Sequence, residues 1–441
     1  MKGEWGLPVV GYLPFMNRKI TKTFGKLQKK YGNIFCLKFG SRIFIVLSDY
    51  NLIKQTFQKP EFSGRPSFYN LNVVRTNNHL GIILSNGIQW STNRKFALRT
   101  LRDFGFGKTP ILDEIILTEA RLLIQDLRQN VDKPIEIEWN INVAVLNVIF
   151  SLLASRRFDV SDKEIKDFTK HLNENVEDME GPLALFSIFP WMVSIVPKYV
   201  KYKWMGLARI VGKREKILDL LKKFIKEHRE SLDQNNPRDY VDKYLIECES
   251  QKDNPEFSHC GELDLLINMY DFFIAGSETT SSIIRWFFLY MSKFPEVQKR
   301  VQKEIDEIVP KGQLPSLYDK DKKCFILLYN FNGSIVIPNI ETCHKDPKYW
   351  KHPNTFSIDN FLDEDGKFIR NKEGYLPFGL GRRQCLGESL AKMELFLFIG
   401  SILQNFQILE PDGQNVSLQP LDTTNILNMA PKFEVILKNR N

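Results

Sequence analysis

Residues 378–387, FGLGRRQCLG, place a single cysteine, Cys385, close behind two arginines in a glycine-containing loop. The glycines allow tight or left-handed turns, so the loop can approach a flat surface closely. The apolar run that follows predicts a helix whose amide ends point back at the loop, and their partial positive charge, with Arg382 and Arg383, favours the thiolate. A thiolate axial ligand beside a propionate-binding arginine suits haem iron, whereas the alternative is a small buried cysteine before a helix.

A second group of candidate residues lies in the motif AGSETT. Asp271, Ala275 and Thr279 recur every four residues and therefore share one face of a predicted helix over 263–294, where Gly276 permits a local distortion. A bare carbonyl and a hydroxyl could then meet a bound ligand. The alternative is that the threonine hydroxyls of this motif bond back to the preceding turn of their own helix.

Trp90 and Arg94, in WSTNR, are one helical turn apart. By themselves they are equally consistent with a surface cation over an aromatic ring. Further basic residues would make a basic face suited to an acidic partner domain, or else a solvated helix face. These residues are Lys95, Arg99, Arg102 and Arg382.

Composition limits the class of protein. With 441 residues, of which 43% are hydrophobic, the chain can bury a large core. Its six cysteines show no framework spacing, which indicates a reducing compartment. The net charge of +8 is spread along the chain, so nucleic acid is not an expected partner. Neither a long apolar span nor a signal-peptide core is recognisable, so the chain as given is not expected to span a membrane.

The fold is predicted to be mainly α with small β-sheets, in a single domain, since no repeat or linker interrupts the chain. Alternating β-branched and aromatic residues over 34–48 predict a strand pair. Helical periodicity then dominates. It predicts helices over 113–131, 208–232, 263–294 and 295–309.

Five residues carry a family resemblance. Phe378, Gly381, Arg383, Cys385 and Gly387 match the haem-binding loop of the cytochrome P450 family. Other stretches, among them FSGRP, SNGIQW, LRDFGFGK and AGSETTSS, look most like the microsomal family-2-like branch of animals. The resemblance implies one cytochrome P450 domain over 1–441 that binds haem b (iron protoporphyrin IX) and acts as a monooxygenase on a hydrophobic small molecule.

The resemblance also implies a role for each matched residue. Cys385 is the fifth iron ligand and Phe378 packs beside its sulfur. Ala275 faces the haem, Thr279 orients the oxygen ligand, and Glu278 helps to relay protons, because oxygen cleavage needs protons delivered in place. The implied propionate-binding residues are Arg383, Trp90, Arg94 and Arg65.

The implied partners are an NADPH-cytochrome P450 reductase, possibly with cytochrome b5, on the cytoplasmic face of the endoplasmic reticulum membrane. The proline-broken, aromatic segment 182–207 would roof the substrate pocket and dip into the bilayer surface, although such segments are also often core. The chain begins where a proline-rich hinge follows the membrane anchor in the family, so the anchor is expected to be absent and membrane binding peripheral. Cys343, His344 and His352 fit no standard zinc spacing.

A larger departure from the family lies near 322–334. Family members carry there a helix with a Glu-x-x-Arg pair and then a strand, but this chain has only KKCFILLYNFNGS. Downstream, Asn360 stands where the family has an arginine. The buried ion network that braces the haem loop therefore lacks its usual charged members.

Three hypotheses remain open at this point. The first is an active monooxygenase, which Glu278 and Thr279 favour. The second is a haem-thiolate protein without such turnover, acting as an isomerase or a ligand binder. The third is an inactive product of splicing or of an erroneous gene model, which the missing helix favours. The first is the assignment that we carry forward.

Overall fold

The computed structural model describes residues 2–17, 19–74, 80–105, 110–178, 180–254, 261–308, 335–369, 372–421 and 428–440. The segment KKCFILLYNFNGS, on which the predicted gap depends, lies outside these residues. The chain forms two compact units. Unit 1 comprises Met1–Asn70, Pro182–Met205 and Asp319–Leu386, and unit 2 comprises Leu71–Gly181, Gly206–Tyr318 and Gly387–Asn441.

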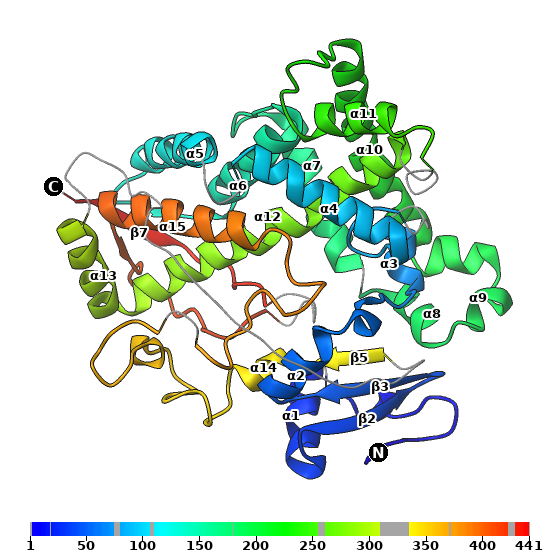
Figure 1. Ribbon diagram of the computed structural model, residues 1–441. Helices are drawn as coiled ribbons and strands as arrows, with labels where there is room; N and C mark the ends of the chain where they lie inside the picture. The colour runs from blue at the N-terminus through cyan, green and yellow to red at the C-terminus, as the bar shows by residue number, and fades with distance from the viewer. Residues whose placement is uncertain are drawn as a thin grey trace. The chain divides into compact units, whose positions relative to one another are not determined.

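Unit 1 is built on a four-stranded sheet of order β1-β2-β3-β5, drawn in blue and yellow in Figure 1. Strands β2 (Ile34–Phe39) and β3 (Arg42–Leu47) are antiparallel, which confirms the predicted strand pair. The short strand β1 (Gly3–Glu4) lies parallel to β2, and β5 (Ile335–Pro338) lies parallel to β3.

The other elements of unit 1 are short helices. They are η1 (Leu13–Phe15), α1 (Ile20–Tyr31), α2 (Tyr50–Phe57), η2 (Pro60–Ser63), η3 (Pro182–Ala184), α8 (Leu185–Ile188), α9 (Met192–Ile195), the π-helical turn η4 (Val200–Trp204), α14 (Ile340–Cys343) and η6 (Ile358–Phe361). Leu47 on β3, Trp350 and Leu376 belong to one buried apolar cluster. The sheet and the stretch just before the Cys385 loop therefore share a core.

Unit 2 is mainly helical. Its helices are α4 (Gly87–Asp103), α5 (Pro110–Arg128), α6 (Glu138–Ala154), α7 (Lys163–Asp178), α10 (Leu207–Glu230), α11 (Tyr240–Ser250), α12 (Glu262–Lys293), α13 (Pro295–Ile308) and α15 (Glu388–Asn405). Strands β4 (Pro134–Ile135), β7 (Val435–Asn439) and β6 (Phe406–Leu409) form an antiparallel sheet in that order. Helix α3 (Tyr69–Val74) contains the sequence boundary between the units.

The four predicted helices correspond to α5, α10, α12 and α13, which confirms them to within a few residues. The mainly α fold with small sheets, which is the single-domain cytochrome P450 fold, is confirmed as well. Among the described residues, no helix combines the length and the apolar character needed to cross a membrane.

Helix α12 is the long central helix of unit 2 and packs closely on α6, whose residues are buried on nearly every side (Figure 1). The distortion that Gly276 permits is not adopted, because α12 continues as an α-helix through this position. A Cβ atom at Gly276 would lie 2.8 Å from Cδ1 of Ile149 on α6, so the glycine also favours close packing of the two helices.

Candidate active site

Unit 1 carries the Cys385 loop directly before helix α15. The side chain of Cys385 is exposed, and its backbone N–H donates a hydrogen bond of 3.0 Å to the carbonyl oxygen of Phe378. Gly379 and Gly381 have φ angles of +70° and +80°, in the left-handed region that glycine adopts without strain. The turn therefore brings the two ends of the loop together and leaves the sulfur accessible.

The same loop is tied to the segment after α2. The Nε of Arg383 donates to the carbonyl oxygen of Ser63 at 2.7 Å, and Arg65 follows two residues later. Arg65 is exposed when the residue is taken as a whole. Nearby protein nevertheless desolvates its guanidinium, and this burial lowers the pKa of the group. Within unit 1, the structure thus connects the thiol loop, Arg383 and the Arg65 segment.

Unit 2 carries the second pair of predicted propionate ligands. Trp90 is buried on α4, and Arg94 is half-buried one helical turn further along the same helix. Asn93 lies between them and donates a hydrogen bond of 3.1 Å to Asp264 on α12. The position of this pair relative to α12 is therefore set by a buried polar contact.

Asp264 was missed by the sequence analysis. Its buried carboxylate accepts hydrogen bonds from Asn93, from the backbone N–H of Gly81 at 2.9 Å and from the Tyr244 hydroxyl at 2.5 Å. It thereby joins α4, α11, α12 and the stretch before α4. Asp271, predicted to share a face with Ala275, is also buried and accepts from the amides of Ile82 and Ile83.

Helix α12 places the three predicted residues near its centre. Ala275 and Thr279 are exposed, although most side chains around them on α12 are buried. Glu278 is buried, and burial raises its pKa to about 7 against the opposing field of Arg285. Its Oε1 has no hydrogen-bond partner among the residues that the structure describes. This carboxyl group can therefore gain or lose a proton near neutral pH.

The two threonines of AGSETT have different partners. The Thr279 hydroxyl donates to the carbonyl oxygen of Ala275 at 2.7 Å, as the alternative interpretation of the motif predicted. That contact leaves the hydroxyl oxygen able to accept a hydrogen bond. The Thr280 hydroxyl instead donates to Glu394 on α15, a wholly buried carboxyl whose pKa burial raises to about 8.

The aromatic segment 182–205 is partly core and partly surface. Leu183, Phe186 and Phe189 are buried in unit 1. The exposed apolar side chains are Leu185, Trp191, Ile195, Tyr199, Tyr202 and Trp204. The segment is therefore partly core, as one interpretation held, and its contact with a bilayer stays a prediction.

The predicted basic residues are exposed in both units. Lys95, Arg99 and Arg102 lie along α4, where Arg99 forms an ion pair of 2.7 Å with Glu247, and Arg382 is exposed in unit 1. An exposed pair of this kind is worth little in water, so Arg99 remains able to change partners.

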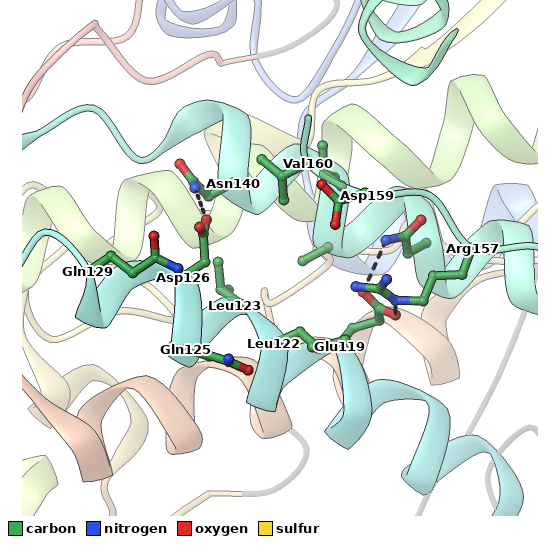
Figure 2. A pocket seen from close by; sticks show the side chains of 13 residues that line it. Glu119, Leu122, Leu123, Gln125, Asp126, Gln129, Asn140, Arg157, Asp159 and Val160 are labelled. Carbon is green, nitrogen blue, oxygen red and sulfur yellow. Dashed lines mark hydrogen bonds and ion pairs between the residues drawn. The ribbon is translucent and has the colours of Figure 1, made fainter. Parts of the chain in front are cut away.

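Figure 2 shows a separate cavity of about 280 Å³ between α5, α6 and the stretch after α6. Its acidic groups are paired: Glu119 accepts from Arg157 at 2.7 Å and from Asn147 at 3.1 Å, and Asp126 accepts from Asn140. The cavity includes none of the predicted site residues. Its side chains form a satisfied hydrogen-bond network, so we do not assign a ligand to it.

The donor atoms of the predicted site fit haem. Unit 1 offers a thiol that can ligate iron as the thiolate, with guanidinium groups for carboxylates. Unit 2 offers a guanidinium, an indole N–H and the exposed surface of α12 around Ala275.

The sequence also matches known proteins. The pattern that defines the family described as Cytochrome P450 matches residues 1–322 and 331–437. The chain is 39% identical to cytochrome P450 2L1 of Panulirus argus, covering 99% of this chain and 94% of the relative. It is 34% identical to cytochrome P450 2C28 of Mesocricetus auratus, covering 96% and 91%, and 34% identical to cytochrome P450 18a1 of Drosophila melanogaster, covering 99% and 86%. The chain therefore belongs to the cytochrome P450 family, whose members are haem-iron monooxygenases of the oxidoreductase class.

Proposed function

We propose that this chain inserts one oxygen atom from O2 into a hydrophobic small molecule, using electrons from an NADPH-dependent reductase. The observation that carries the proposal is the accessible sulfur of Cys385 on a loop whose backbone is held by Gly379, Gly381 and the contact between Cys385 and Phe378. The cofactor that this loop would hold is haem b, and Cys385 would supply the thiolate that binds its iron.

Bound haem supplies the iron at which oxygen is reduced. Cys385 would hold the group through its sulfur, with Phe378 beside it. Basic and indole N–H donors would bind the carboxylates of the group and so orient it. These donors are Arg383, Arg65, Trp90 and Arg94.

Glu278 and Thr279 handle protons on the oxygen-binding side. A carboxyl group with a pKa of about 7 is populated in both protonation states at neutral pH, which suits a group that must accept and release protons in each cycle. The exposed Thr279 hydroxyl donates to the Ala275 carbonyl and keeps its oxygen available as an acceptor, so it can fix the position of a ligand proton. Ala275 leaves room beside it.

The exposed aromatic residues of unit 1 support contact with a membrane surface. Trp191, Ile195 and Trp204 are half or more exposed, and Lys198 and Lys203 lie over neighbouring tyrosine rings. Aromatic and basic side chains together favour the boundary between headgroups and acyl chains. We assign this surface to the cytoplasmic face of the endoplasmic reticulum, and the basic residues of α4 to the reductase or to cytochrome b5.

The spectrum of the reduced, carbon monoxide-bound protein tests the proposal. A thiolate ligand gives a strongly red-shifted Soret band, and Cys385→Ser should abolish it. Cys248→Ser is the matched control, because Cys248 is a half-buried cysteine on α11 in unit 2 and should leave the band unchanged. A red-shifted band that persists in Cys385→Ser would refute the assignment of the ligand.

One observation supports the third hypothesis, an inactive product that lacks the Glu-x-x-Arg helix. The alignment with cytochrome P450 2L1 spans 469 positions, more than the 441 residues of this chain, so the relative carries residues that have no counterpart here. We assign part of this difference to the segment near 322–334. A red-shifted band without substrate turnover would support a haem-thiolate protein that binds ligand only.

A further inference from the structure

Just before the Cys385 loop, a histidine side chain accepts a hydrogen bond from a backbone amide. The N–H of Leu376 donates a hydrogen bond of 2.8 Å to Nε2 of His344, across 32 residues of sequence. Leu376 is 4% exposed, and two residues later the loop starts at Phe378. This contact is therefore the anchor at the amino-terminal end of the loop.

The geometry defines the protonation state of His344. A backbone amide can only donate, so Nε2 must be an acceptor, and the imidazole must be neutral with its proton on Nδ1. Burial lowers the pKa of His344, in agreement with a neutral ring. Glu341 on α14 opposes this shift, but its carboxylate is paired with Lys345 at 2.7 Å. The adjacent Tyr375 phenol is uncharged, since burial raises its pKa.

The imidazole is itself held in place by aromatic rings. Its centroid lies 5.7 Å from Tyr375 and 6.2 Å from Trp350, and the Trp350 indole donates to the carbonyl oxygen of Cys343 at 2.8 Å. Phe361 packs on both Trp350 and Tyr375. A ring fixed on several sides loses little additional entropy when it accepts the amide hydrogen bond.

Helix α14 then connects His344 to the sheet. The backbone N–H of Asn339 donates to Leu47 at 2.7 Å, and its side chain donates to Ser48 at 3.0 Å. The His344 amide in turn donates to the carbonyl oxygen of Ile340 at 3.0 Å. The chain of contacts from β3 to the start of the loop consists of neutral groups.

Asn360 completes this arrangement. It is buried, accepts from the backbone N–H of His352 at 2.8 Å and donates to the His352 carbonyl at 3.0 Å. Asn360, which stands in place of a family arginine, therefore binds the backbone of His352 through neutral groups only. Its fixed position also holds the neighbouring Phe361 against Trp350.

We propose that neutral His344 is a positioning residue that holds the amino-terminal end of the Cys385 loop, and that protonation of His344 in acid releases it. The proposal rests on the proposed function, because it assigns the loop to haem binding. It gives this chain a neutral brace between the sheet and the thiolate loop. It also predicts a pH dependence that a purely apolar brace would not have.

The direction of the pH effect follows from the lowered pKa. The unfolded chain binds this proton near the usual value of 6.5, whereas the folded chain binds it more weakly. The stability contributed by the contact is therefore present above pH 6.5 and is lost as the pH falls through the lowered pKa. Loosening of the loop should follow the same profile.

The test compares His344→Gln and His344→Phe with the parent and with His352→Gln, whose exposed imidazole lies eight residues away. The first measurement is hydrogen–deuterium exchange of residues 374–387 in the haem-free full chain at pH 7.5 and 5.5, corrected for the intrinsic exchange rate. The second is the rate at which the haem-loaded chain loses haem to excess apomyoglobin at the same pH values. Neither readout depends on turnover.

His344→Phe should raise exchange and haem loss about tenfold at pH 7.5, equivalent to ~1.4 kcal/mol, and should flatten the pH profile. His344→Gln, whose amide oxygen can still accept, should stay within about twofold of the parent at pH 7.5 and resist acid. His352→Gln should match the parent throughout. Parent-like exchange and a parent-like pH profile in His344→Phe would overturn the proposal.

The assignment of Cys385 as haem ligand and the role of His344 can be refuted independently. If Cys385→Ser keeps the red-shifted band, the assignment of the haem ligand is wrong whatever His344 does. If Cys385→Ser loses the band but His344→Phe changes neither exchange nor haem loss, only the role of His344 is wrong. If the chain takes up no haem, exchange of residues 374–387 still decides whether His344 holds the loop.

Discussion

Substitution of two glycines in one loop separates backbone strain from steric clash. Gly379 and Gly381 have similar φ angles, +70° and +80°, so alanine at either position costs about 1–2 kcal/mol in left-handed backbone strain. A Cβ at Gly379 would meet nothing within 4 Å, whereas a Cβ at Gly381 would lie 1.8 Å from the carbonyl oxygen of Phe57. The difference between the two variants therefore measures the clash alone.

The clash at Gly381 is large because its partner is backbone. To reach an ordinary van der Waals separation of 3.4 Å, the loop would have to withdraw from Phe57 by about 1.6 Å. A binding site must be held to within about 0.5 Å, and a misplacement of 1 Å can cost about 10²-fold in rate. Gly381→Ala should therefore lose most of its haem, while Gly379→Ala should keep it with a modest loss of stability.

The assay is the molar ratio of haem to protein after purification, with the amplitude of the red-shifted carbon monoxide band. Thermal unfolding of both variants provides the stability comparison. Gly379→Ala should lower the folded-to-unfolded ratio by a factor of about 5–30. Equal haem content in the two variants would show that the approach of Gly381 to Phe57 does not control the loop, and the reasoning would be refuted.

Other predictions concern the proton-handling residues of α12, the buried carboxylate of Asp264 and the segment near 322–334. Glu278→Gln should stabilise the protein more at pH 8 than at pH 5 by urea unfolding, because a carboxyl with a pKa raised to about 7 weakens folding as the pH rises from 4.5 through 7. Thr279→Ala should bind haem and substrate normally but divert reducing equivalents to peroxide, and equal coupling of electrons to product would remove Thr279 from the mechanism. Asp264→Asn should lower the free energy of unfolding by about 1–3 kcal/mol, whereas the exposed control Asp253→Asn should not. A complete helix and strand from a close relative, grafted in place of 322–334, should raise haem retention and melting temperature, and no change in either would make the missing helix dispensable.

Local periodicity was enough to predict four of the long helices, α5, α10, α12 and α13. Helix α10 runs from Leu207 to Glu230 where a helix over 208–232 was expected, because its apolar side chains repeat at helical spacing and become its buried face. The stretch 182–205 has no such period. Its prolines and aromatic residues divide it into the short elements η3, α8, α9 and η4. The conformation of these elements depends on how the aromatic rings pack within unit 1.

The motifs indicated the candidate site, but they did not indicate what positions it. Cys385, Arg383 and Thr279 were found because their family pattern is contiguous. Asp264 and Asn93 are 171 residues apart, and neither belongs to a motif, so their contact has no signature in a single sequence. The contact between Gly276 and Ile149 on another helix likewise has no signature in a single sequence.

The missing charged network need not leave the Cys385 loop without support. A buried ion pair must offset the desolvation of both partners, and a single remaining charge would be strongly destabilising. The sequence predicts that both kinds of charge are absent together in this chain, and Asn360 and His344 bind backbone groups whose desolvation is already compensated by hydrogen bonds. Such neutral contacts are short-ranged, so they restrain the start of the loop but do not attract a distant segment. We therefore expect changes at His344 to loosen the start of the loop, and a restored segment at 322–334 to add the further support that raises haem retention.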